Sequence, residues 1–210
     1  VAAGSGSSFA ITVDGSVWSW GRGNGGRLGL GDTRDRLKPE RIEGFPAGVR
    51  MRSVAASMHT LAVDVTGRVW AWGYNWYGQV GDGTTTDRLR PVRLEGLERV
   101  VDVDVGYTHS LAADADEKLF SWGRGGGCGH PGFGGATRPR QVEALDQHRA
   151  INVAAGCDFS VVAADLARRA GGGGAWSATS FVFAFGDNNG GQLGRGDTEA
   201  RVGPQEVDLG

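Results

Sequence analysis

Short segments in which large apolar residues alternate with small or polar ones recur along the chain. Val17-Trp18-Ser19-Trp20 is one such segment, and Val69-Trp70-Ala71-Trp72 is another. Alternation with a period of two is the pattern of a β-strand that buries one face. The pairs Asp14-Gly15 and Thr66-Gly67 precede these segments and are typical of hairpin turns. The pattern therefore predicts short strands joined by tight turns.

These strand segments belong to a repeat that occurs four times. Each copy contains an aromatic-glycine pair, and successive pairs are 52, 50 and 63 residues apart: Trp20-Gly21, Trp72-Gly73, Trp122-Gly123 and Phe185-Gly186. A proline follows each pair after 17 to 19 residues: Pro39, Pro91, Pro139 and Pro204. Because proline cannot donate a hydrogen bond to a neighbouring strand, the segment around it is expected to be an edge strand. The copies lie near residues 1–50, 51–102, 103–150 and 151–210.

The repeat and the composition together predict the fold class. Sheets of about four strands that recur every 40 to 50 residues or so are typical of β-propellers. Glycine accounts for 38 of the 210 residues, which disfavours helices and suits tight turns. An apolar fraction of 40% and seven tryptophans are sufficient for a folded core. We therefore expect an all-β fold, a β-propeller of four-stranded blades with four repeats in this chain.

The motifs also resemble those of a known family. The copy over residues 54–94 contains His-Thr-Leu-Ala, then Gly-Arg-Val-Trp-Ala-Trp-Gly, then Gly-Gln-Val-Gly and a proline with an aliphatic residue three positions later. This order resembles the regulator of chromosome condensation repeat family, and the resemblance extends over essentially the whole chain. Propellers of this family usually have roughly seven blades, within the general range of 4–8. The resemblance implies a partial propeller, which blades outside this sequence or another chain would complete.

An aromatic cluster that the repeat does not require is one candidate binding site. Tyr74, Trp76 and Tyr77 follow directly on the strand that ends at Trp72-Gly73. Exposed aromatic residues in a loop on a rigid scaffold are common at protein interfaces. Packing between adjacent blades is the alternative interpretation, and the sequence does not decide between the two.

An insertion in the fourth copy is a second candidate. Val161 and Phe183 are 22 residues apart, whereas their counterparts Leu61 and Trp70 in the second copy are 9 apart. The additional segment contains an arginine pair, a glycine run and a tryptophan, and its candidate partner-binding residues are Arg168, Arg169 and Trp176. A docking hairpin and a surface insertion without a binding role both fit this composition.

Two histidines occupy the same position of the repeat. His59 and His109 stand where the other copies have Ser7 and Phe159. Because half of the copies lack the histidine, we expect a structural role, namely a blade-stabilising hydrogen bond to a neighbouring backbone group. In the family, such histidines on one face of the ring have been connected with binding of a small GTPase. The resemblance therefore also makes His59 and His109 candidates for a GTPase-binding face.

Other sequence features argue against several functional classes. The net charge of −2 and the absence of a basic run disfavour direct nucleic-acid binding, and no apolar stretch is long enough to span a membrane. The glycines at positions 21, 23 and 26 fit a dinucleotide-binding motif, but a turn follows them instead of a helix. The spacing of Cys128, His130, His148 and Cys157 matches no structural zinc site. We expect no catalytic residues, no cofactor and no metal ion.

A non-enzymatic scaffold or adaptor that binds protein partners, as part of a larger protein or assembly, is the function that these observations favour. The resemblance leaves guanine nucleotide exchange on a Ran-type small GTPase as an alternative. A third possibility is an ultraviolet photoreceptor, whose signature in the family has tryptophan directly before the repeat His-Thr. Met58 and Thr108 stand at that position here, which disfavours it. An intracellular location, cytoplasmic or nuclear, is the expectation, with an organelle left open.

Overall fold

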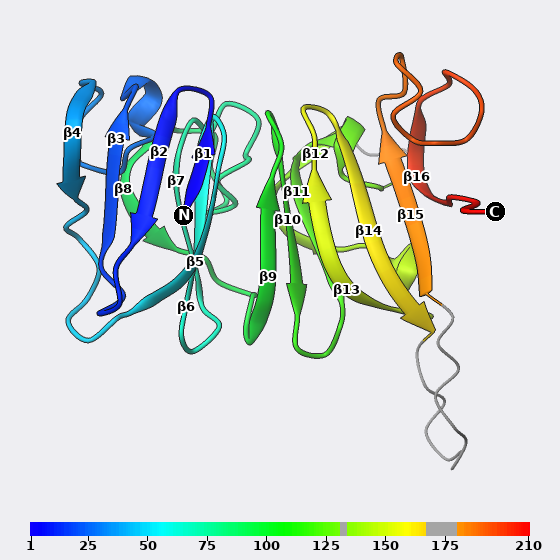
Figure 1. Cartoon of the computed structure of the whole chain (residues 1–210), viewed down its shortest axis with the longest axis horizontal. Coiled ribbons are helices and arrows are strands. Elements are labelled where there is room, and N and C mark those ends of the chain that lie inside the picture. The colour runs from blue at the N-terminus through cyan, green and yellow to red at the C-terminus, as the bar shows by residue number, and fades with distance from the viewer. Residues whose placement is uncertain (131–133, 167–179) are drawn as a thin grey trace, which may run out of the picture.

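The computed structural model describes residues 1–130, 134–166 and 180–210. Within these residues, sixteen β-strands form four antiparallel sheets, and each sheet is made by one repeat, with its strands in chain order (Figure 1). Blade 1 contains β1 (Ala2–Gly4), β2 (Ser7–Ile11), β3 (Val17–Gly21) and β4 (Arg36–Arg41). Blade 2 contains β5 (Met51–Ala56), β6 (His59–Asp64), β7 (Val69–Gly73) and β8 (Arg88–Arg93).

The other two sheets repeat this plan. Blade 3 contains β9 (Val100–Val105), β10 (His109–Asp114), β11 (Leu119–Arg124) and β12 (Gly135–Gln141). Blade 4 contains β13 (His148–Ala155), β14 (Phe159–Leu166), β15 (Ser180–Gly186) and β16 (Arg201–Glu206). Three short 3-10 helices lie in the connections of the described residues: η1 (Asn24–Gly26), η2 (Gly125–Gly127) and η3 (Glu143–Leu145). The four prolines of the repeat lie in β4, β8, β12 and β16, the predicted edge strands.

The blades follow one another as an arc, from blade 1 at the left of Figure 1 to blade 4 at the right. Inner strands of consecutive blades are in contact, namely β2 with β5, β6 with β9, and β10 with β13. The predicted all-β propeller of four-stranded blades is confirmed. The arc is open in this structure, and its completion to a ring of roughly seven blades stays a prediction.

The apolar core lies between the blades, because alternate side chains of each strand face opposite neighbours. Phe9 and Leu28 of blade 1 pack with Trp70 and Trp72 of blade 2. Equivalent clusters lie between blades 2 and 3 and between blades 3 and 4. Trp72 and Trp122 are fully buried in these interfaces. Trp18 and Trp20 have the strand positions of Trp70 and Trp72 but are only partly buried, because they lie on the open side of blade 1.

Candidate protein-binding site

The loops of the blades lie on two opposite faces of the arc. We call the face with the loops between first and second strands and between third and fourth strands the upper face, which is at the top of Figure 1. The loop after Gly73 that contains Tyr74, Trp76 and Tyr77 lies on this face, since it connects β7 to β8. The loops between second and third strands lie on the opposite face, which we call the lower face.

The strands that flank the second candidate segment meet at the lower face. Asp165 near the end of β14 pairs with Ser180 at the start of β15, so the segment between these strands begins and ends at the lower face. Arg168, Arg169 and Trp176 belong to that segment and lie outside the described residues. Their role in binding a partner therefore stays a prediction from the sequence.

The aromatic loop is held on a fixed backbone by a buried amide. The side chain of Asn75 is fully buried, and its Nδ2 donates hydrogen bonds to the carbonyl oxygens of Thr84 and Thr86, both at 3.1 Å. Its Oδ1 accepts a hydrogen bond of 2.9 Å from the backbone N–H of Val80. Asn188 makes the equivalent bonds in blade 4, so an asparagine that recurs at this repeat position is a sequence signal of the fixed loop.

The three aromatic residues have different environments. The ring of Tyr74 lies under the guanidinium of Arg27 of blade 1, with 5.2 Å between the guanidinium carbon and the ring centroid. The ring of Tyr77 has the same relation to Arg124 of blade 3, at 5.3 Å. Trp76 makes an edge contact with Tyr74 at 6.1 Å but is 70% exposed, and Tyr77 is 47% exposed. Both interpretations of the cluster therefore describe part of it: Tyr74 packs against a neighbouring blade, while Trp76 is available to a partner.

Comparison of the blades shows that these aromatic residues are not needed to build a blade. Asn24 and Asn189 stand at the repeat position of Trp76, and the positions of Tyr77 are glycines in the same two copies. Tyr107 is a further exposed aromatic residue of the upper face, 47% exposed, in the loop between β9 and β10. The sequence analysis missed Tyr107, although serine or cysteine stands at its position in the other copies.

The repeat histidines form hydrogen bonds between blades. His59 Nε2 lies 2.6 Å from the hydroxyl of Ser110 in the next blade, and this hydroxyl donates to the carbonyl of Gln79 at 2.8 Å. His109 Nε2 lies 2.9 Å from the hydroxyl of Ser160, which donates to the carbonyl of Gly127 at 2.7 Å. Because each hydroxyl has one proton and gives it to a carbonyl, Nε2 must carry the histidine proton and donate it.

The role is structural, but each histidine bonds to a serine side chain of the next blade and not to the backbone group that we expected. Both imidazole rings are fully buried, so neither reaches the surface in this structure. Their Nδ1 atoms are buried and lack a hydrogen-bond partner within the described chain. Burial lowers the pKa of His59 to about 3 and that of His109 to about 4, which keeps both rings neutral. A contribution of these histidines to a GTPase-binding face stays a prediction.

Replacement of Ser110 by alanine is expected to destabilise the fold by about 2 kcal/mol, because the buried N–H of His59 then has no acceptor. The variant His59→Phe/Ser110→Ala is expected to be more stable than the sum of its two single changes, since it removes both partners; phenylalanine stands at this repeat position in blade 4. Urea unfolding of the two single variants and the double variant measures this coupling. Strictly additive effects would show that the bond between His59 and Ser110 contributes nothing.

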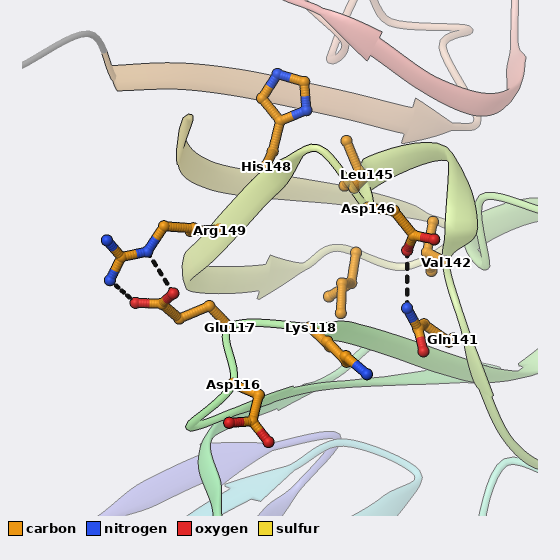
Figure 2. A pocket seen from close by; sticks show the side chains of 10 residues that line it. Asp116, Glu117, Lys118, Gln141, Val142, Leu145, Asp146, His148 and Arg149 are labelled. Carbon is orange, nitrogen blue, oxygen red and sulfur yellow. Dashed lines mark hydrogen bonds and ion pairs between the residues drawn. The ribbon is translucent and has the colours of Figure 1, made fainter. Parts of the chain in front are cut away.

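A cavity of about 420 Å³ lies at the lower face between blades 3 and 4 (Figure 2). Arg149 forms an ion pair with Glu117 at its edge, and Gln141 donates a hydrogen bond of 2.7 Å to Asp146. His148 is turned toward β15, where its ring packs at 4.7 Å on that of Phe183. The polar side chains of these two pairs therefore already have a hydrogen-bond or ion-pair partner in each other.

A similar cavity of about 330 Å³ occupies the equivalent place between blades 1 and 2. It is lined by the turn at residues 15–17 and by the connection at residues 41–49, which correspond to the lining segments of the larger cavity. Since the cavity recurs with the repeat, we attribute it to the construction of the blades rather than to a ligand.

No group of three or more histidine, cysteine, aspartate or glutamate side chains in the described part of the chain could hold a metal ion. No helix in that part is long and apolar enough to cross a membrane. Burial raises the pKa of the Cys128 thiol to about 12, which makes it a poor nucleophile.

Comparison with known proteins identifies the repeats. The model of the regulator of chromosome condensation (RCC1) repeat matches residues 14–63, 66–113, 116–163 and 181–209. This chain belongs to the RCC1 repeat family. A second model of the RCC1 repeat matches residues 100–129. The resemblance inferred from the sequence motifs is therefore confirmed.

Several RCC1 relatives and solved structures match nearly all of the chain. The ultraviolet-B receptor UVR8 of Arabidopsis thaliana is 33% identical over 214 residues, which cover 99% of this chain and 45% of the receptor. The protein RCC2 homolog of Danio rerio is 31% identical over 96% of this chain and 44% of the homolog. The human E3 ubiquitin-protein ligase HERC2 is 32% identical over 95% of this chain and 4% of the ligase. The chain thus spans less than half the length of these relatives.

Two solved structures support the RCC1-type fold. The structure of human WBSCR16 aligns with a TM-score of 0.81 and 24% identity, covering 99% of this chain and 52% of the other. Yeast RCC1 (Prp20), in complex with Kap60, aligns with a TM-score of 0.78 and 20% identity, covering 98% and 48%. At these identities the likeness shows the propeller fold of the four blades and not their function.

Proposed function

We propose that this RCC1-repeat chain is a non-enzymatic protein-interaction scaffold that binds its partner through the upper face around Trp76. The observation that carries the proposal is the exposure of Trp76. Its side chain is 70% exposed on a loop fixed by the buried Asn75, and blades 1 and 4 have asparagine at the repeat position of Trp76. Tryptophan, tyrosine and arginine are the residues that contribute most at protein interfaces. Tyr77, the next residue in the chain, stacks with Arg124 of blade 3, which extends the surface toward that blade.

The Trp76→Ala variant is expected to lose at least tenfold in affinity for the partner, with its midpoint of thermal unfolding within about 1 °C of the parent, since the side chain is mostly in solvent. The partner is captured from the source organism on immobilised protein and identified by mass spectrometry, and its affinity is then measured for both proteins. Leu37→Ala is the matched control, because Leu37 is 98% exposed on the edge strand β4. Equal loss in both variants, or none in Trp76→Ala, would contradict the proposal.

Guanine nucleotide exchange on a Ran-type GTPase is the second function that we propose to test. It is supported by membership of the RCC1 repeat family alone, and the chain spans only part of the family members that it matches. Release of a fluorescent guanine nucleotide from a panel of small GTPases measures it directly. Release that is no faster with the chain present would leave the scaffold role and exclude exchange on those GTPases.

A further inference from the structure

The aromatic loop of blade 2 lies between two exposed arginines of the neighbouring blades. Arg22 directly follows β3 and Arg124 ends β11, so both occupy the repeat position that Tyr74 occupies in blade 2. Both side chains are exposed, and neither forms an ion pair with any residue that the structure describes. Arg34 of the loop between β3 and β4 differs in this respect, since it pairs with Asp32, and Arg88 at the start of β8 pairs with Asp82.

A third arginine adds positive charge beneath the same loop. Arg27 is only 5% exposed, and its guanidinium donates to the carbonyl oxygens of Ser5 at 2.6 Å and Asn24 at 3.1 Å. The same guanidinium lies over the ring of Tyr74. The carbonyl groups and this ring are neutral, and Arg27 forms no ion pair within the described chain. A buried cation without a counter-ion gives the surface above it a positive potential.

Three carboxylates of the upper face accept hydrogen bonds from other groups of the protein. Asp35 accepts from the backbone N–H of Gly23 and Asp87 accepts from that of Asn75, both at 2.9 Å. Asp158 accepts a hydrogen bond of 2.8 Å from the hydroxyl of Thr108. These carboxylates hold loops of the upper face in place, and none of them pairs with an arginine in the described chain.

We propose that the partner of the upper face presents a peptide segment in which aspartate or glutamate flanks an apolar side chain. This inference rests on the proposed function. The apolar side chain packs on Trp76, and the carboxylates pair with the guanidinium groups of Arg22 and Arg124, which lie on either side of it. Beyond Arg124 the surface continues as a cavity of about 400 Å³ lined by Asp158 and Asp187, so the acidic segment ends at Arg124 instead of entering that cavity.

Selection from a displayed library of random twelve-residue peptides tests this inference. Peptides that bind the parent chain but not the Trp76→Ala variant form the Trp76-dependent pool. We expect this pool to be enriched at least threefold in aspartate and glutamate over the starting library. A Trp76-dependent pool that is neutral or basic would overturn the inference and leave the proposed function intact. A pool without any Trp76-dependent peptides would count against both.

One selected peptide then gives the contribution of each arginine. By fluorescence anisotropy, replacement of its acidic residues by their amides is expected to weaken binding at least tenfold. Arg124→Gln is expected to weaken it about fivefold, and an increase of salt to ~0.5 M should remove most of this difference. Arg93→Gln is the matched control, because it removes the same charge from an exposed position at the end of β8. Equal effects of the two variants would overturn the assignment of Arg124.

Discussion

A change from pH 7 to pH 5 is expected to destabilise the folded chain by about 4 kcal/mol, with about half from each of the buried histidines. Burial lowers the pKa of His59 to about 3 and that of His109 to about 4, from the usual value of 6.5. The positive charge that His109 would carry lowers the pKa of His59 further, and Asp158 partly offsets the burial of His109.

The sign of this pH effect follows from whether the folded or the unfolded chain binds more protons. In the unfolded chain both imidazoles take up a proton as the pH falls through about 6.5, whereas in the folded chain they stay neutral until about pH 4 or 3. Unfolding is therefore favoured progressively over this window. At pH 5 the difference from the unfolded pKa is about 1.5 units for each group, which corresponds to about 2 kcal/mol per histidine.

Urea unfolding followed by tryptophan fluorescence at pH 7, 6 and 5 measures this effect. In the variant His59→Gln/His109→Gln, in which the glutamine amides can donate in place of Nε2, the loss between pH 7 and 5 is expected to be much smaller than in the parent. The remainder comes largely from His130, whose pKa is also lowered by burial. A parent protein that loses no more than this variant would show that the two rings do not stay neutral.

Carboxylates interfere little in this pH window. The pKa values of Asp14 and Asp64 are lowered by hydrogen bonds, so these groups reduce stability only as the pH falls through about 3.8, their usual value. Burial raises the pKa of Asp104, which acts in the opposite direction and reduces the slope in parent and variant alike. The comparison between the two proteins therefore isolates His59 and His109.

The sequence predicted the fold because several anchors of the repeat recur in phase. The alternation in Val69-Trp70-Ala71-Trp72 gave the strand and its two faces, and Pro91 gave the edge strand that follows. The same alternation could not give the exposure of Trp18 and Trp20, which have the strand positions of Trp70 and Trp72. Burial at these positions depends on an adjacent blade, and no alternation within one repeat specifies that neighbour.

The candidate site was predictable only in part, because its contacts join different repeats. Both His59 and Ser110 stand at recurring positions of the sequence, but their hydrogen bond connects residues 51 apart and depends on how two blades pack. That β14 ends and β15 begins at the face opposite the aromatic loop follows from strand direction alone. Tyr107 illustrates a different limit. The sequence shows that it differs from the serine or cysteine of the other copies, but its exposure becomes evident only from the fold.

The glycine of each aromatic-glycine pair is a position where a side chain would strain the blade. The glycines of the pairs all have positive φ, between 97° and 111°, and the pairing of β11 with β12 shifts register at Gly123. A Cβ at Gly123 would lie 2.4 Å from the carbonyl oxygen of Thr108 and 2.8 Å from the Cα of His109. Both atoms are backbone, so relief of the clash requires movement of the strand that carries His109.

Gly123→Ala is therefore expected to destabilise the chain by about 3 kcal/mol or more, from the cost of positive φ and of displacing β10. Gly126→Ala is the matched control three residues away, where a Cβ meets no atom within 4 Å and φ is not positive. This control is expected to change stability by less than about 1 kcal/mol, with a slight gain possible through the unfolded state. Urea unfolding at pH 7 compares both variants with the parent. Similar stabilities of the two variants would mean that β10 adjusts freely at this point, and the recurrence of glycine after the aromatic residue would then need a cause other than the backbone of β10.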